Sequence, residues 1–334
     1  MDITTCEEME NIANYAPLSI ALLTFTIISI IGVPMVIYLI FNIFHNSLYH
    51  SNTKILLLAH CFFLLLHLLN RIFLHSLDLY RWHITLPKTN SGCDILLTSN
   101  DCFFYRFIFN CGIWFSGTTP LFIIIERYLA TVKITTYQND KKYGFLLIVA
   151  QIMVSGFFLS MLYNGYSFGT SRYYCMTAKP NMSFYKSISL LGIALTQVLA
   201  VIGLQFLFQK NMKIQQVFKE QGVHLLKRYQ VEETLRSLKT LKQPIYTMFI
   251  SQFLFTSCSF FCHRYGFHFA QEDYYVTLES FVLLPEYSRL LSNLESEKFY
   301  TMLESLVVLP EYTLIFVITF IQTDNRIKLQ GLKN

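Results

Sequence analysis

Residues 16–44 read APLSIALLTFTIISIIGVPMVIYLIFNIF and contain no charged side chain. The uncharged stretch is longer still, because no Asp, Glu, Lys or Arg occurs between Glu10 and Lys54. A helix needs roughly 20 apolar residues to cross the hydrocarbon core of a bilayer. The stretch is long enough for one such helix and too apolar for the core of a soluble domain, so it predicts a membrane-spanning helix.

Six further apolar runs follow along the 334 residues, and the whole chain is 53% hydrophobic and 14% charged. A soluble domain has about 25% charged residues. We therefore predict an all-α membrane protein, with residues 1–334 forming a single seven-transmembrane helical bundle in the lipid bilayer. The predicted spans are residues 16–44, 55–77, 103–125, 145–162, 188–208, 245–262 and 303–321.

Charges between the runs predict the orientation, because Lys and Arg concentrate on the cytoplasmic side of membrane proteins. With the N-terminus outside, the inside segments hold sixteen Lys and Arg and the outside segments hold eight. The first ten residues are acidic and lack the basic start of a cleaved signal peptide, so the first run is expected to stay as a span. The net charge of +5 is spread over these loops, which argues against nucleic-acid binding.

The longest inside connection, residues 209–243, has the periodicity of a helix. Apolar residues recur at spacings of three and four, as on one helix face, at Val231, Leu235, Leu238, Leu241 and Ile245. We expect the fifth and sixth spans to continue into the cytoplasm as helices. A solvated hairpin without a partner is the alternative.

A short repeat lies near the C-terminus. Residues 278–287 (LESFVLLPEY) recur 25 positions later as residues 303–312 (LESLVVLPEY), with eight of ten positions identical. Only the second copy continues into an apolar run, so residues 275–300 are predicted to be a duplicated segment in the last outside loop. The duplication is either real or an artefact of the gene model.

The tripeptide Glu126-Arg127-Tyr128 lies at the predicted inner end of the third span. An acid beside an Arg at a helix end can form an ion pair that opens when a partner offers the guanidinium better bonds. Arg suits this role because its guanidinium is planar and always charged. The alternative is an Arg whose head group reaches the membrane surface, beside an interfacial Tyr. We favour a role in coupling to a G protein.

Four of the eight cysteines, Cys6, Cys93, Cys102 and Cys175, fall outside in this orientation, where disulfides form. Four cysteines allow three pairings. We favour Cys102–Cys175, which would hold the second outside loop over the bundle, with Cys6–Cys93 as the second possible bridge. Asn181 begins an Asn-Met-Ser glycosylation sequon on the same side.

Polar side chains inside predicted spans are candidates for a ligand pocket. Arg106 lies one turn into the third span, where it could attract an anionic or polar ligand, and Asn110 lies one turn further. The alternative is hydrogen bonding between helices without ligand contact. It applies equally to the polar residues of the second span, His60, His67, Asn70 and Arg71.

Motifs of catalysis and metal binding are missing from the sequence. It contains no His-Glu-x-x-His, no Gly-x-Ser-x-Gly, no phosphate-binding Gly loop and no pair of Cys-x-x-Cys motifs. We therefore expect no enzyme activity, no metal and no cofactor. Related halves, which are common in transporters, are also missing.

Several motifs resemble those of the nematode serpentine chemoreceptors, and most closely those of serpentine receptor class alpha, a family of G-protein-coupled receptors. They are DCFFYR (residues 101–106), IERYLAT (125–131), LKRYQVEET (226–234) and LPEYT (309–313). The chain departs from rhodopsin-like receptors, since its sixth run lacks Cys-Trp-x-Pro and its seventh lacks Asn-Pro-x-x-Tyr.

The resemblance implies a receptor in the plasma membrane of sensory neurons that binds a small odorant or tastant and activates a heterotrimeric G protein. The alternative function is a ligand-gated ion channel of inverted seven-span topology, with its N-terminus inside. The distribution of basic residues argues against this channel.

Overall fold

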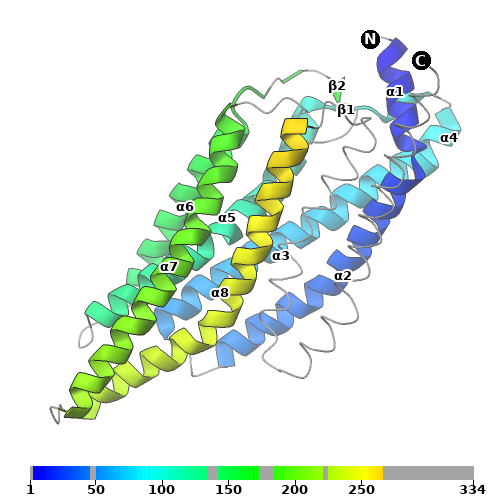
Figure 1. Cartoon of the computed structure of the whole chain (residues 1–334). Helices are drawn as coiled ribbons and strands as arrows, with labels where there is room; N and C mark the ends of the chain where they lie inside the picture. The colour runs from blue at the N-terminus through cyan, green and yellow to red at the C-terminus, as the bar shows by residue number, and fades with distance from the viewer. Residues whose placement is uncertain are drawn as a thin grey trace, which may run out of the picture.

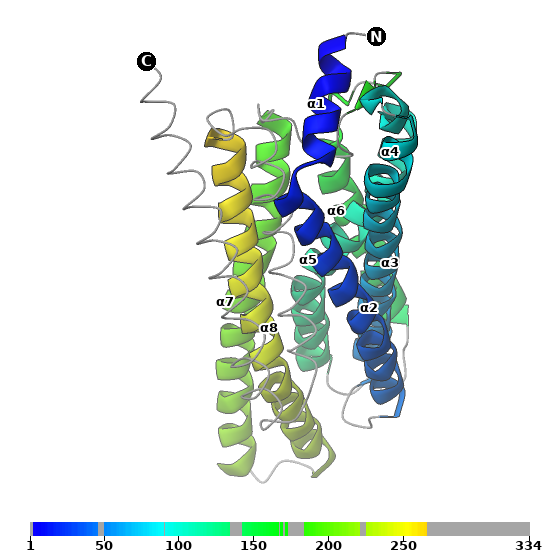
Figure 2. The same cartoon turned by 90° about the vertical axis from the view of Figure 1, so that its right-hand side faces the viewer.

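The computed structural model describes residues 3–45, 50–89, 91–133, 142–166, 168–169, 171–172, 184–220 and 225–265. These residues form a bundle of long helices, drawn from two sides in Figures 1 and 2. The N-terminal helix and the short elements lie at one end, and the last turn of the helix Phe184–Glu220 and the first turn of the helix Leu225–Tyr265 lie at the other. We call these the outer and inner ends.

Five helices are long and apolar enough to cross a membrane. They are α2 (Ala16–His45), α3 (Ser51–Tyr80), α5 (Ser99–Val132), α6 (Lys142–Leu162) and α7 (Phe184–Glu220). Helix α8 (Leu225–Tyr265) contains a shorter apolar segment, Met248–Ser257. The first six predicted runs each lie within one of these helices. The seventh run, residues 303–321, and the duplicated segment, residues 275–300, lie outside the described residues.

Helix α5 runs through the middle of the bundle and is the most buried of the five. Its first turn is capped by Thr98, whose Oγ1 accepts a hydrogen bond from Asp101 N (3.2 Å) and donates one to Asp101 Oδ2 (2.7 Å). The outward faces of α2 and α6 instead expose apolar side chains, including Ile20, Ile31, Phe145 and Met153. Such faces are suited to lipid, because exposing apolar side chains to hydrocarbon avoids the free-energy cost of exposing them to water.

Helices α7 and α8 continue well past their apolar runs and meet at the inner end (Figure 1). This confirms the prediction that the fifth and sixth spans are extended by helix. The apolar residues that recur along the start of α8 are all buried: Val231, Leu235, Leu238, Leu241 and Ile245. The periodicity therefore reflects packing of α8 against the bundle.

The outer end is built from short elements around a small apolar core. They are α1 (Ile3–Ala13), a π-helix (Arg81–Thr85), α4 (Leu86–Thr89), a 3-10 helix (Gly92–Ile95) and an antiparallel pair of β1 (Leu97–Thr98) and β2 (Ser171–Arg172). Met9 and Ile12 of α1 pack with Trp82 and Ile95 in this core. The sequence pattern did not predict α1, which is short and lies beside the first span.

Candidate functional site

The inner end of α5 carries a buried ion pair between neighbouring residues. Arg127 Nε lies 2.5 Å from Glu126 Oε2, and Arg127 Nη2 lies 2.6 Å from Glu126 Oε1. Both residues are almost fully enclosed, with 0% of Glu126 and 3% of Arg127 exposed. Two parallel N–H···O contacts of this kind form the strongest type of charged hydrogen bond in proteins.

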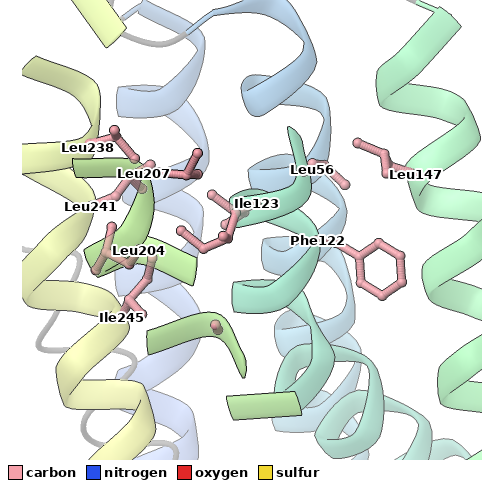
Figure 3. Packing of buried hydrophobic residues seen from close by; sticks show 11 residues of the cluster. Leu56, Phe122, Ile123, Leu147, Leu204, Leu207, Leu238, Leu241 and Ile245 are labelled. Carbon is pink, nitrogen blue, oxygen red and sulfur yellow. The ribbon is translucent and has the colours of Figure 1, made fainter. Parts of the chain in front are cut away.

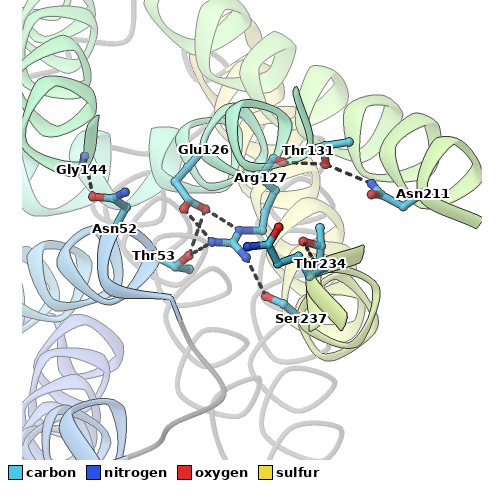
Figure 4. Close-up of polar contacts among 10 residues, drawn as sticks. Asn52, Thr53, Glu126, Arg127, Thr131, Gly144, Asn211, Thr234 and Ser237 are labelled. Carbon is cyan, nitrogen blue, oxygen red and sulfur yellow. Dashed lines mark hydrogen bonds and ion pairs between the residues drawn. The ribbon is translucent and has the colours of Figure 1, made fainter. Parts of the chain in front are cut away.

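Hydroxyl groups from two other helices complete the ion pair (Figure 4). Thr53, at the start of α3, donates a hydrogen bond to Glu126 Oε2 at 2.9 Å and accepts one from Arg127 Nη2. Ser237, on the inner part of α8, accepts one from Arg127 Nη1 at 3.5 Å. A buried charge pair is tolerated only when its remaining donors and acceptors are bonded. The four residues, which we call the inner polar cluster, meet this need with groups from α3, α5 and α8.

A second layer of hydrogen bonds holds the surrounding helices in place. Asn52 Oδ1 accepts from Gly144 N at 3.1 Å, which ties α3 to the start of α6. Asn211 of α7 donates to Thr131 Oγ1 at 3.1 Å, and Thr131 in turn donates to the carbonyl of Arg127 at 2.9 Å. Figure 4 shows these contacts on either side of the ion pair. The backbone that carries Arg127 is therefore linked to α7 as well.

An apolar core lies next to the inner polar cluster and separates it from the rest of the bundle. Figure 3 shows side chains from α3, α5, α6, α7 and α8 meeting in it. Its buried members include Leu56, Ile123, Leu204, Leu238 and Ile245. An apolar surrounding strengthens the attraction between Glu126 and Arg127, because the local dielectric is low.

Ser237 of α8 contacts the inner polar cluster at a longer distance than Thr53 of α3 does. Thr53 contacts both members of the ion pair, whereas Ser237 contacts Arg127 at 3.5 Å. A hydrogen bond of that length is at the long end of the normal range. Glu126 and Thr53 therefore hold the guanidinium more closely than Ser237 does.

Tyr128 does not join the ion pair. It is 44% exposed, and Lys210 Nζ of α7 lies 5.3 Å from the centre of its ring. A cation at this distance from an aromatic ring is attracted to it. Tyr128 is therefore presented on the surface between α5 and α7, beside the buried Glu126–Arg127 pair.

His50 precedes α3 and adds a titratable group to the same end of the bundle. Burial lowers the pKa of its imidazole, and the positive charge of Arg127 lowers it further, while Glu126 and Glu233 act in the opposite direction. The ring is thus held neutral near pH 7. Protonation would place a second positive charge near Arg127.

The predicted ligand residues of the outer half are buried in contacts between helices. The Arg106 guanidinium lies 5.1 Å from the centre of the Phe109 ring, and Arg71 of α3 lies 5.2 Å from the same ring. Asn110 donates to the Tyr163 hydroxyl at 3.0 Å. The structure thus brings Arg106 and Asn110 to one side of α5 beside aromatic rings.

Polar residues of α3 form hydrogen bonds to α5, as the alternative interpretation of these residues expected. His60 Nδ1 lies 3.1 Å from Thr119 Oγ1, and His67 Nδ1 lies 2.9 Å from the carbonyl oxygen of Phe109. The Asn70 amide donates to the carbonyl of Tyr105 at 2.8 Å. These three side chains therefore join α3 to α5 along its length.

The predicted outside cysteines divide between described and undescribed parts of the chain. A disulfide joins Cys6 of α1 to Cys93, and the glycine next to it, Gly92, packs against the backbone of Cys6. Cys102 is also disulfide-bonded. Cys175, its expected partner, and the sequon residue Asn181 lie outside the described residues. The Cys6–Cys93 bridge fastens α1 to the outer end of the bundle.

Within the described part of the chain, no group of three or more His, Cys, Asp or Glu side chains is arranged to hold a metal ion. The buried residues Glu126, His60 and His67 instead form hydrogen bonds to neighbouring helices. The site is thus made of polar contacts between helices.

Comparison with known proteins identifies the family. The family described as serpentine-type seven-transmembrane GPCR class ab chemoreceptors matches residues 3–293. The chain belongs to this family. The family is one of multi-pass chemoreceptors of the G-protein-coupled class. The motifs had suggested class alpha within the serpentine group, but the match is to class ab.

Two serpentine receptors from Caenorhabditis elegans are similar to this chain. Serpentine receptor class alpha/beta-14 is 27% identical over 216 residues, which cover 61% of this chain and 52% of that protein. Serpentine receptor class beta-16 is 25% identical over 145 residues, which cover 43% of this chain and 41% of that protein. The chain thus matches about half the length of these relatives.

Sequence reasoning singled out Glu126 and Arg127 but missed Thr53 and Ser237. These partners lie 74 and 110 positions from Arg127 and belong to no recognisable motif. The apolar periodicity of α8 was visible in the sequence and predicted a buried face, but not that this helix lies next to the third span. No signal in the sequence distinguishes Ser237 from other serines.

Proposed function

We propose that this class ab receptor binds a small odorant or tastant in its outer half and activates a heterotrimeric G protein at its inner end. The observation that carries the proposal is the inner polar cluster, in which Arg127 is buried against Glu126 and Thr53 and touches Ser237 of α8. In this resting arrangement the guanidinium is covered by α8.

Activation in this proposal is a shift between two populations of conformers. A ligand that prefers the conformer with α8 moved outward raises the population of that conformer. Separation of the inner end of α8 from α5 breaks the 3.5 Å contact to Ser237 and uncovers Arg127. Carbonyl or carboxylate groups of the G protein then bond the guanidinium, and the exposed Tyr128 supplies part of the docking surface.

Arg106 and Asn110 are the proposed ligand contacts of the outer half. Both lie on α5, so a change in their contacts with Phe109 or Tyr163 acts on the helix that carries Arg127. A disulfide between Cys102 and Cys175 and glycosylation of Asn181 are proposed for the outer side. The proposed location is the plasma membrane of sensory neurons, with the N-terminus outside.

The experiment that tests this function compares the receptor with Arg127→Ala at equal surface level. Cells carrying a panel of Gα subunits are exposed to a panel of odorants and tastants, and second-messenger signals are recorded. We expect responses from the receptor and none from Arg127→Ala, because Arg127 is the group that bonds the G protein. Normal responses from Arg127→Ala at normal surface level would refute the assigned role.

Orientation is tested separately with an epitope tag before Asp2. Antibody labelling of unpermeabilised cells is expected, since the outer end carries the N-terminus and the Cys6–Cys93 bridge. Labelling only after permeabilisation, in cells with confirmed surface expression, would place Arg127 outside and favour the inverted ion channel.

A further inference from the structure

The central helix α5 is intrinsically weak over residues 116–120, which read SGTTP. Gly, Ser and Thr all favour helix less than Ala does, and Pro is the least favourable residue of all. Pro120 lacks an N–H group, so α5 is missing one of its i→i−4 hydrogen bonds at this point. Helices bend at such positions unless neighbouring groups support them. The helix is nevertheless continuous from Ser99 to Val132.

Polar side chains from three neighbouring helices support this weak segment. Gln197 of α7 donates its amide to the carbonyl oxygen of Gly117. Gln151 of α6 donates to the carbonyl oxygen of Phe115 at 3.0 Å and to Thr119 Oγ1 at 2.8 Å. Further contacts at this level join Ser155 to Thr118 at 2.8 Å and His60 to Thr119 at 3.1 Å.

The two glutamines leave part of their hydrogen-bonding capacity unused. Gln151 is 0% exposed and Gln197 is 2% exposed, yet the Oε1 atom of each has no hydrogen-bond partner in the described part of the chain. A buried carbonyl oxygen without a donor is costly, and it marks a place where another arrangement can compete.

The segment also lies between the two halves of the proposed signalling path. At 1.5 Å per residue, Pro120 is about 15 Å along the helix from Asn110 and about 10 Å from Arg127. A change transmitted along α5 from its outer half passes through residues 116–120 before it reaches the inner polar cluster.

We propose that residues 116–120 are a hinge in α5, and that Gln151 and Gln197 are positioning residues that hold the hinge in the resting conformation. The signalling role of the hinge rests on the proposed function, whereas the flexibility of α5 at residues 116–120 does not. We call the hydrogen bonds that Gln151 and Gln197 donate to this segment the clamps. Loss of either clamp lets the inner half of α5 turn relative to the outer half. That movement alters the contact of Arg127 with Ser237.

The hinge is tested by hydrogen–deuterium exchange on the full-length receptor in lipid nanodiscs, read over residues 113–124. Gln197→Leu keeps the side-chain size and removes the clamp, so exchange should rise about fivefold, the effect of losing one hydrogen bond. The matched control is Gln205→Leu on the same helix. Gln205 bonds the Tyr246 hydroxyl of α8 at 2.8 Å and has no contact to the hinge, so exchange should not change.

Pro120→Ala provides a test of opposite sign, because it restores the missing N–H group and should slow exchange over the same residues. The proposal is overturned if Gln197→Leu does not raise exchange above the Gln205→Leu level and Pro120→Ala does not lower it. The opposite signs keep the test informative even if one variant does not fold.

Ligand-free signalling at equal surface level separates the hinge from the proposed function. Gln197→Leu should raise basal signalling about fivefold, and adding Arg127→Ala should remove the gain. Glu126→Gln opens the ion pair directly. If this variant signals without ligand, and Gln197→Leu shows faster exchange but no ligand-free signalling, the hinge does not transmit the signal. If neither signals and exchange still rises, the hinge stands and the G-protein function fails.

Discussion

Thr53 at the start of α3 donates a hydrogen bond to Glu126 Oε2 on α5 at 2.9 Å, and its oxygen also accepts a bond from Arg127. A single hydroxyl thus contacts both members of the buried ion pair. It fixes the carboxylate in the position that holds the guanidinium. The resting state of the inner polar cluster therefore depends on this threonine as well as on the two charges.

Replacing Thr53 with Val keeps the side-chain shape and removes the hydroxyl. We expect the free energy of unfolding to fall by about 1.5 kcal/mol, the value of a hydrogen bond to a charged group, and basal signalling to rise. The control is Thr24→Val, because Thr24 is a partly exposed threonine whose described hydrogen bond stays within its own helix, to the Ile20 carbonyl at 2.8 Å. Equal stability and equal basal signalling in the two variants would contradict the role of Thr53.

Replacing Gly112 with Ala tests the close approach of α3 and α5. An added Cβ would lie 2.4 Å from His67 Cβ and 2.9 Å from the Phe63 carbonyl oxygen, so the helices would have to separate. Overpacking of this kind costs about 1–3 kcal/mol, and thermal unfolding in nanodiscs should show it.

Gly156→Ala is the matched control for Gly112→Ala. No described atom lies within 4 Å of an added Cβ at Gly156, which is also inside a helix. Its stability should be unchanged or should rise by up to about 1 kcal/mol, because Ala favours helix over Gly. A stable Gly112→Ala receptor would mean that α3 and α5 pack less closely than described.

Removing the Cys6–Cys93 bridge should release α1 from the outer end. The bridge closes a loop with a sequence separation of 87, and such a disulfide contributes about 2–5 kcal/mol. The double variant Cys6→Ser/Cys93→Ser should therefore unfold at a lower temperature, and α1 should become sensitive to protease. Cys111→Ala removes a free cysteine and should change neither property.

The pKa of His50 predicts how stability depends on pH. Burial and Arg127 hold the folded-state pKa below the ordinary value of 6.5, so the unfolded chain binds this proton more readily than the folded receptor does. Stability from this group is complete above pH 6.5 and falls as the pH is lowered through 6.5 toward the folded-state pKa. Unfolding temperatures between pH 7.5 and 5 should fall less in His50→Gln than in the receptor. Identical pH profiles would show that His50 is freely protonated.

The sequence predicted the parts of the fold that depend on local pattern. Uncharged runs such as residues 16–44 locate helices because the membrane requires them, and the spacing of Val231, Leu235 and Leu238 located the buried face of α8. The neighbouring charges of Glu126 and Arg127 were also visible. These features depend on local sequence, so they can be predicted without knowing which helices are in contact.

The rest depends on contacts between distant segments. Thr53 and Ser237 gain their importance only because three helices meet at Arg127. The clamp of Gln197 on Gly117 joins residues 80 positions apart. The Cys6–Cys93 bridge was among the pairings predicted from the sequence. The packing of α1 against Trp82 and Ile95 was not, because a short sequence with weak periodicity does not reveal it.

The most direct test of the account measures guanine-nucleotide exchange on a panel of Gα subunits by membranes containing Glu126→Gln. This change removes the negative charge that holds Arg127, and breaking a buried ion pair costs about 3–5 kcal/mol. We predict that ligand-free exchange rises about tenfold or more over the unaltered receptor, and that Glu126→Gln/Arg127→Ala returns it to background. Exchange by Glu126→Gln that equals that of the double variant, at equal amounts of folded receptor, would contradict the claim that Arg127 couples this receptor to a G protein.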